Sequence, residues 1–251
     1  MSAFFRKEMT EHMRRKRIFV IGILFLLFAV LGVVTAKLTP LILEMVADQM
    51  PGFTMDKTES DIWDAWGQYF KNIDIPLIVF LILWSGSFTT EYQKHTLIPL
   101  VTKGLSRTGI YVSKMVSAAL VWTAGYALYF GIFYFYSDFY WGNGELKNVV
   151  ISVGMYWLYG LWLLAILGLF SSFADTAMQV LLGVGGVFFV CSFSEFVPKL
   201  APKLPTALTG GLGLMQGKAV PSDFTVPFVI VMVSIVLCTA GGIALIQKKQ
   251  L

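Results

Sequence analysis

Residues 18–36 read IFVIGILFLLFAVLGVVTA, nineteen consecutive residues without a charged side chain. A helix rises about 1.5 Å per residue, so this stretch is nearly as long as the ~30 Å hydrocarbon core of a bilayer is thick. The segment therefore predicts a membrane-spanning helix. Because the stretch is too long for a signal-peptide core and has no small-residue cleavage site, we expect it to remain as an anchor.

Five further charge-free gaps of 16 to 27 residues follow along the chain. All six gaps together predict spans near 18–36, 75–90, 115–137, 149–174, 176–195 and 225–247. The second span reaches only about 24 Å, so we expect it to extend into its flanks or to lie in thinned bilayer. The chain is 57% hydrophobic and 14% charged, which excludes a water-soluble globular fold. We expect an all-α polytopic integral membrane protein with one transmembrane domain over residues 1–251.

The charged residues are divided unequally between the two sides that six spans define. The side with both termini carries 12 basic and 4 acidic residues, and the other side carries 7 basic and 11 acidic residues. Cytoplasmic loops of membrane proteins carry the excess of lysine and arginine. We therefore expect a multi-pass protein of the cytoplasmic (inner) membrane with both termini in the cytoplasm.

The N-terminal residues 1–17 contain six basic side chains. At helical spacing Phe5, Met9 and Met13 share one face, and the basic residues occupy the rest of the helix. This pattern predicts an amphipathic interfacial helix, an elbow that lies along the inner leaflet. The alternative is that the charges only determine the topology.

Two long segments on the opposite side have different characters. Residues 37–74 form an acidic loop with several aromatic residues. We expect these aromatic residues to anchor the loop at the membrane interface; the alternative is that they recognise substrate. Prolines and glycines exclude a long helix over 196–225, and leave room for a short surface or re-entrant helix near 206–215.

Ionisable residues are confined to the span ends in this reading, at Asp74, Glu91, Asp175 and Glu195. Ion-coupled transporters place such residues within the membrane, so the pattern argues against a secondary transporter. His12 and His95 are far apart in the sequence, which argues against an intramembrane metalloprotease. We expect no catalytic residue and no metal site.

Aromatic side chains are concentrated in the third and fourth spans. They line a path for an amphipathic substrate or, alternatively, form packing and interfacial contacts. The candidate path residues are Trp122, Tyr126, Tyr129, Phe133, Tyr156 and Trp157.

The segment 91–114, EYQKHTLIPLVTKGLSRTGIYVSK, joins the second and third spans on the terminal side. It is too long for a turn and too polar for a span. The spacing of Thr96, Leu97, Leu100 and Val101 fits one apolar face of a short helix. Ser106 is placed to cap the helix that follows. We expect a helix that docks on another protein; the alternative is a solvated loop.

This segment resembles a motif of the permease subunits of type-2 ABC exporters, which have a six-helix membrane domain. The family motif has the form E…GTL..LLTKP.SR…..K. The matching residues are Glu91, Thr96, Leu97, Leu100, Val101, Thr102, Lys103, Ser106, Arg107 and Lys114. The sequence departs from the motif where His95 replaces the usual glycine and Gly104 replaces a frequent proline. Chain length, the basic N-terminal helix and the helix order are also similar.

The resemblance implies two permeases, as two copies or as this chain with a paralogue, assembled with two cytoplasmic ABC ATPase subunits. It implies a coupling helix between the second and third spans. The implied coupling residues are Glu91, Thr96, Leu97, Leu100, Lys103, Ser106 and Arg107. ATP and Mg²⁺ are expected on the partner ATPase, because this chain has no nucleotide-binding motif. We expect no cofactor in this chain, membrane lipids around it and no nucleic-acid partner.

The function we expect is outward transport of a hydrophobic or amphipathic molecule, in the first instance a toxin or antimicrobial peptide. Export of a lipid or a drug by the same architecture is one alternative. A non-transporting membrane anchor or sensor for a cytoplasmic partner is another.

Overall fold

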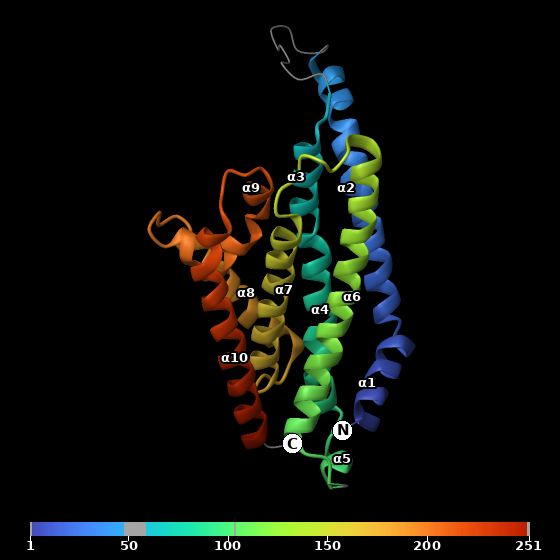
Figure 1. Cartoon of the computed structure of the whole chain (residues 1–251). Helices are drawn as coiled ribbons and strands as arrows, with labels where there is room; N and C mark the ends of the chain where they lie inside the picture. Colours follow the sequence, from blue (N-terminus) through green and yellow to red (C-terminus); the bar gives the residue numbers. More distant parts are fainter. Residues whose placement is uncertain (1, 48–58, 103, 250–251) are drawn as a thin grey trace.

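The computed structural model describes residues 2–47, 59–102 and 104–249, and every regular element within them is helical (Figure 1). Six of these helices are long and apolar enough to cross a membrane. The prediction of an all-α polytopic membrane protein is confirmed. The elements in chain order are α1 (Ser2–Arg14), α2 (Arg17–Ala47), α3 (Ile62–Asn72), α4 (Asp74–Gln93), α5 (Ile98–Thr102), α6 (Arg107–Trp141), α7 (Val149–Ser171), α8 (Ala177–Ser194), η1 (Ala201–Lys203), η2 (Pro205–Thr209), α9 (Gly211–Met215), η3 (Pro221–Phe224) and α10 (Thr225–Lys248).

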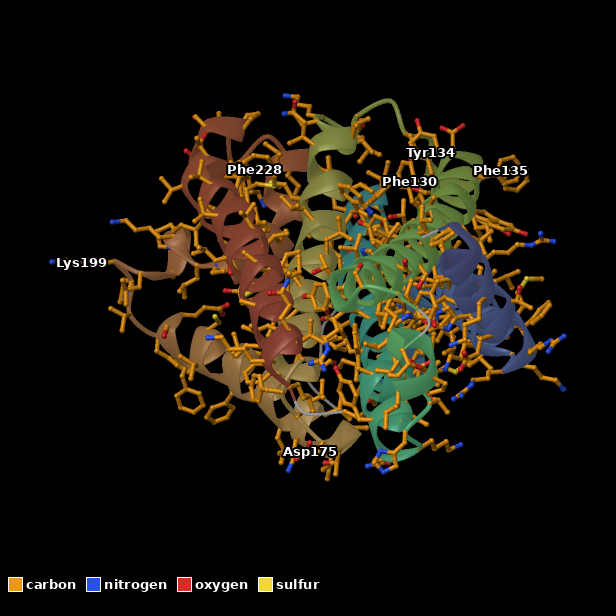
Figure 2. All side chains as sticks on the ribbon, turned by 90° about the horizontal axis from the view of Figure 1, so that it is seen from below. Phe130, Tyr134, Phe135, Asp175, Lys199 and Phe228 are labelled. Carbon is orange, nitrogen blue, oxygen red and sulfur yellow. The ribbon has the colours of Figure 1, made fainter. Side chains whose placement is uncertain are left out.

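Helix α7 is the centre of the bundle. Its spanning segment is 67% buried, whereas those of α8 and α10 are only 11% and 17% buried. It packs against α4, α6, α8 and α10, and the short elements η2 and α9 cover one end of it. Figure 2 looks along the bundle from the end that carries the chain termini and shows α1 on one flank, Lys199 projecting on the other and Asp175 in the α7–α8 turn. The outer surfaces of α8 and α10 are therefore apolar faces that the rest of the described chain leaves uncovered.

The described chain begins and ends at the same end of the bundle, as six spans require (Figure 1). We call this end, where α1, α5 and the last turn of α10 lie, the terminal end. Helices α3 and α9 lie toward the opposite end.

The second span is longer than its charge-free gap because two helices continue one another. α3 and α4 together form an apolar rod over residues 62–93, and Ile73 between them keeps helical angles (φ −68°, ψ −22°). Pro76 has no N–H to donate to Asn72 four residues earlier, which explains the interruption at this point. The span thus extends into its flank as expected, and much of the expected 37–74 loop is helical instead.

Helices α2 and α6 also exceed their predicted spans. α2 continues through Pro40 to Ala47, and α6 begins at Arg107. The expected 91–114 connection is therefore shorter than predicted, since residues 107–114 form the first two turns of α6. The segment near 206–215 is short and helical, as predicted, in η2 and α9.

Helix α1 confirms the predicted N-terminal helix but buries a different stripe. Phe4, Glu8 and His12 are buried, whereas Met13 is 54% exposed. We expected the apolar stripe of Phe5, Met9 and Met13 to be the buried side of this helix. The buried stripe lies one residue further round the helix because Glu8 and His12 meet polar partners on the neighbouring helices.

Candidate functional site

The connection between α4 and α6 reverses the chain tightly at the terminal end. The Lys94 N–H donates to Thr90 O and the Thr96 N–H to Glu91 O, both at 3.1 Å. His95 has a φ of 52°, in the left-handed region that glycine adopts without steric cost. The glycine expected at this position by resemblance therefore corresponds to a real backbone requirement, which a histidine meets here.

The second departure from the motif lies just beyond α5. Gly104 has a φ of 90°, which proline cannot adopt because its ring holds φ near −65°. Ser106 then begins α6, accepting a hydrogen bond from the Gly109 N–H at 3.1 Å. The predicted cap is confirmed, and the loop shape differs from one built around proline.

Leu97 does not lie on an exposed face, which corrects our expectation of one apolar docking surface. It is 1% exposed and belongs to a core cluster with Phe4, Phe88, Tyr92, Ile110, Tyr111 and Ile246. The exposed apolar surface of this segment is instead formed by Ile98, which is 40% exposed, and Pro99. Leu100 is part of α5, and Lys103 lies outside the described residues.

A cavity of about 600 Å³ opens beside this connection, between α1 and the end of α4. Basic side chains dominate its lining, which consists of Lys7, Glu11, Arg14, Arg15, Thr90, Glu91, Lys94, Thr96 and Pro99. Thr96 is exposed there, and its hydroxyl donates to Glu91 O at 3.4 Å.

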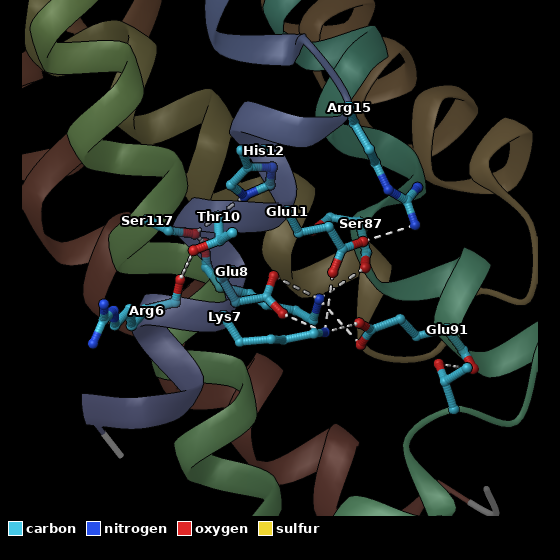
Figure 3. Close-up of polar contacts among 12 residues, drawn as sticks. Arg6, Lys7, Glu8, Thr10, Glu11, His12, Arg15, Ser87, Glu91 and Ser117 are labelled. Atoms are coloured by element: carbon cyan, nitrogen blue, oxygen red, sulfur yellow. Dashed lines mark hydrogen bonds and ion pairs between the residues drawn. The ribbon is translucent and has the colours of Figure 1, made fainter.

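Behind the cavity lies a charged cluster formed by Lys7, Glu8, Glu11, Glu91 and Lys114 (Figure 3). The Lys114 Nζ is 2.9 Å from Glu8 Oε2 and 3.1 Å from Glu91 Oε2. The Lys7 Nζ is 2.8 Å from Glu91 Oε1 and 3.0 Å from Glu8 Oε1. The side chains of Glu8 and Lys114 are only 1% and 2% exposed. The cluster thus ties α1 to α4 and α6 through buried ion pairs.

The charges of this cluster are balanced. Three carboxylates lie within 4.8 Å of one another, an arrangement that a metal ion could in principle occupy. Two ammonium groups and the Arg15 guanidinium, 2.7 Å from Glu11 Oε1, already neutralise them. Burial opposes the charged form of Lys7, but Glu91 and Glu8 outweigh it and raise the Lys7 pKa above its usual value. The cluster is therefore a structural ion-pair network.

His12 adds a neutral member beside the cluster. Burial, assisted by the positive charges of Arg17 and Lys114, lowers the pKa of His12 to about 4. Its ring lies 4.9 Å from the Trp84 ring, and Nε2 is 3.4 Å from the Ser117 hydroxyl. At neutral pH an uncharged imidazole therefore fills the contact between α1 and the bundle.

Arg107 binds the end of α10. Its Nη1 donates to the carbonyl oxygens of Gln247 at 3.0 Å and Ile246 at 3.3 Å. These are carbonyl groups that a helix end leaves without internal partners. Lys249 continues the connection by donating to the Asp175 carboxylate at 3.0 Å. Arg107, predicted as a coupling residue, thus joins α6 to α10 and through it to the α7–α8 turn.

The candidate path residues lie in the packed core. Trp122, Tyr126, Tyr129, Phe133 and Tyr156 are each no more than 3% exposed, and only Trp157 reaches the surface of a cavity. Their polar atoms are occupied within the bundle. The Tyr126 hydroxyl donates to Val153 O and the Tyr129 hydroxyl to Tyr69 O, both at 2.8 Å. In this conformation the five buried aromatic residues hold helices together, and their role in a substrate path stays a prediction.

Glu8 and His12 belong to this site but were not among the site residues predicted from the sequence. Two polar residues four positions apart, in line with Phe4, were an available sign of a buried polar stripe. Lys114, a lone cation at the start of a 23-residue charge-free stretch, was the second sign.

Residues 2–208 match the family described as ABC-2 family transporter protein. No curated protein matches the chain. The matched part covers far more than half of the 251 residues and includes α1, the α4–α6 connection and five of the six spans. The chain therefore belongs to the ABC-2 transporter family, as a multi-pass membrane permease subunit that associates with an ABC ATPase.

Proposed function

We propose that this chain is the permease of an ATP-driven exporter that moves a hydrophobic or amphipathic substrate outward across the cytoplasmic membrane. The proposed assembly has two permeases and two ATPases, and ATP and Mg²⁺ bind only to the ATPases. A toxin or antimicrobial peptide is the substrate we favour, ahead of a lipid or a drug. Family membership supports the ATP-driven class over a non-transporting anchor or sensor.

The observation that carries the proposal is the exposed surface of the α4–α6 connection. Ile98 and Pro99 present an apolar contact beside a basic cavity, at the end where the chain begins and ends. An apolar projection bordered by charge is suited to a groove on another protein. Buried Leu97 and the charged cluster hold this projection rigidly to α1, α4 and α6. A displacement of the projection would therefore be transmitted to three helices.

The orientation follows the same argument. The basic end, with Arg14, Arg15 and Lys94, faces the cytoplasm, and the ATPase binds there. A cysteine at exposed Thr10 should react with a membrane-impermeant maleimide only in inverted vesicles. Labelling of intact cells at this position would contradict the orientation.

The coupling assignment is tested by Ile98→Asp in the complex with its co-expressed ABC ATPase. A carboxylate in the contact should reduce co-purification and permease-dependent ATPase activity at least tenfold. Val150→Asp, a change of another exposed aliphatic residue at the opposite end, should leave both unchanged. Normal ATP turnover with Ile98→Asp would remove α5 from the coupling interface. Leu97 is unsuitable for this test, because its substitution would disturb the core.

A further inference from the structure

An apolar groove lies between α4, α7 and α8, and a carboxylate lies at one end of it. The groove has a volume of about 300 Å³. Its apolar lining includes Leu77, Leu81, Ile82, Leu163, Val184 and Phe188. Asp74, Tyr159 and Gly185 complete the lining, and Asp74 also accepts a hydrogen bond from the Tyr156 hydroxyl.

Asp74 lies within the spanning rod of residues 62–93 and not at its end, contrary to our reading of the sequence. Its partner Tyr156 is seven residues into α7, about 10 Å from the start of that helix. On the other wall, Phe188 is six residues before the end of α8, about 9 Å from it. Because α8 has only 18 residues, about 27 Å, its end marks the limit of the hydrocarbon layer. Measured along α7 and α8, Asp74 therefore lies about a third of the way in from the opposite ends of these helices.

The carboxylate of Asp74 has no cationic partner. Among the described residues its only side-chain bond is to the Tyr156 hydroxyl, and none of the ion pairs includes it. It remains exposed at the groove. An ionisable side chain in the membrane is costly and usually marks a functional site with a definite partner. The missing partner is a cation, and the groove beside it accepts an aliphatic chain.

We propose that this groove binds an amphiphile with one ammonium group and a single aliphatic tail. The ammonium group pairs with Asp74 and donates a further hydrogen bond to the hydroxyl oxygen of Tyr159 or Tyr156, and the tail lies along the apolar walls toward the terminal end. The groove is open to lipid, so the amphiphile enters from the bilayer. This assignment rests on the proposed export function and defines its substrate class as cationic and amphipathic.

The test measures binding of radiolabelled dodecylammonium to the purified permease in phosphatidylcholine nanodiscs. Because the probe partitions into lipid, the signal is the saturable excess over protein-free discs. Asp74→Asn keeps the size and hydrogen-bonding ability of the side chain but removes its charge. We expect it to weaken saturable binding at least tenfold, while the weaker binding of neutral dodecanol should change less than twofold. Equal binding of dodecylammonium by both proteins would overturn the assignment.

Two neighbouring glycines provide a matched steric pair on α8. An added Cβ at Gly185 or at Gly186 meets no atom within 4 Å, so both positions tolerate a side chain. Only Gly185 lines the groove. Gly185→Leu should abolish saturable binding and Gly186→Leu should preserve it; an equal loss in both variants would contradict a site in this groove.

The binding assay contains neither ATP nor ATPase, so its outcome is independent of coupling. If dodecylammonium binds through Asp74 while Ile98→Asp leaves ATP turnover intact, the binding site in the groove is supported and the coupling assignment is wrong. If Ile98→Asp uncouples the complex while Asp74→Asn binds normally, the reverse holds. Saturable binding of dodecyl sulfate as tight as that of dodecylammonium would exclude recognition by charge.

Discussion

The charged cluster and Asp74 show two different surroundings for carboxylates in one membrane protein. At the terminal end, Glu8, Glu11 and Glu91 are neutralised by cations of the same chain at 2.7–3.1 Å. Toward the opposite end, the one side-chain partner of Asp74 within the described part of the chain is a tyrosine hydroxyl. Internal neutralisation indicates a role in holding helices together, because all partners are supplied before any ligand arrives. A carboxylate without a cation is available to a ligand.

Of the variants that test this comparison, Lys114→Met should have the largest effect on the free energy of unfolding. It leaves the almost fully buried Glu8 without its closest buried cation, and breaking a buried pair from one side costs about 3–5 kcal/mol. We expect that loss in the free energy of unfolding measured by denaturation in micelles. The double variant Lys114→Met with Glu8→Gln should recover part of it. A loss below about 1 kcal/mol would show that water or lipid headgroups replace the lysine.

Acid should release α1 from the bundle. The pKa of His12 is about 4 in the folded chain, below its ordinary value of 6.5. Above pH 6.5 the imidazole is neutral in both states, and the contact is at full strength. As the pH falls from 6.5 to 4, protonation increasingly favours the undocked state, by at most about 3 kcal/mol.

Hydrogen exchange of residues 2–14 measures this release. Protection should decrease between pH 7 and pH 5, and His12→Gln should remove most of that dependence while the carboxylates of the cluster still titrate. An unchanged pH profile in His12→Gln would assign the release to Glu8, Glu11 or Glu91 instead.

Lys7→Met should have a smaller effect than Lys114→Met, although both lysines contact the same two glutamates. The Lys7 side chain is 42% exposed, and ion pairs at the surface contribute about 0–1 kcal/mol. Comparing the two methionine variants in the same unfolding assay separates the effect of a lysine's burial on stability from the effect of the number of cations. Equal losses would mean that the network depends on the number of cations and not on their depth.

Asp74→Asn should have the smallest effect on stability. Asp74 lies in the first turn of α4, where a negative charge gains typically less than 1 kcal/mol, and no cation loses its partner when the charge is removed. We expect a change in the free energy of unfolding within about 0.5 kcal/mol. A loss of several kcal/mol would place Asp74 with the cluster as a structural residue and would remove the contrast between the two regions.

Much of the architecture could be predicted from local patterns. The charge-free gaps located all six spans, and Ser106 was recognised as a cap because its spacing to Gly109 is a local feature. The helical extension beyond Lys37 and the joining of α3 to α4 at Ile73 were not predicted, because charged and polar residues there marked the ends of the apolar stretches.

The candidate site was less predictable because its contacts are distant in sequence. Glu8 meets Lys114 across 106 positions, and no local pattern identifies such a pair. Hydrophobic periodicity assigned Phe5, Met9 and Met13 to the buried face of α1 and Leu97 to a docking face, whereas α1 buries Phe4, Glu8 and His12 and Leu97 packs in the core. It cannot recognise a polar stripe that is buried through its partners, and it cannot distinguish an apolar residue that packs inward from one that contacts another protein.

The same separation has a consequence for biosynthesis. Glu8 leaves the ribosome long before Lys114, and at ~5–20 residues per second the interval is roughly 5–20 s. During that time Glu8 has Lys7 of its own helix as a partner but no cation of the third span. The packed position of α1 that the structure shows therefore requires the third span to be in place.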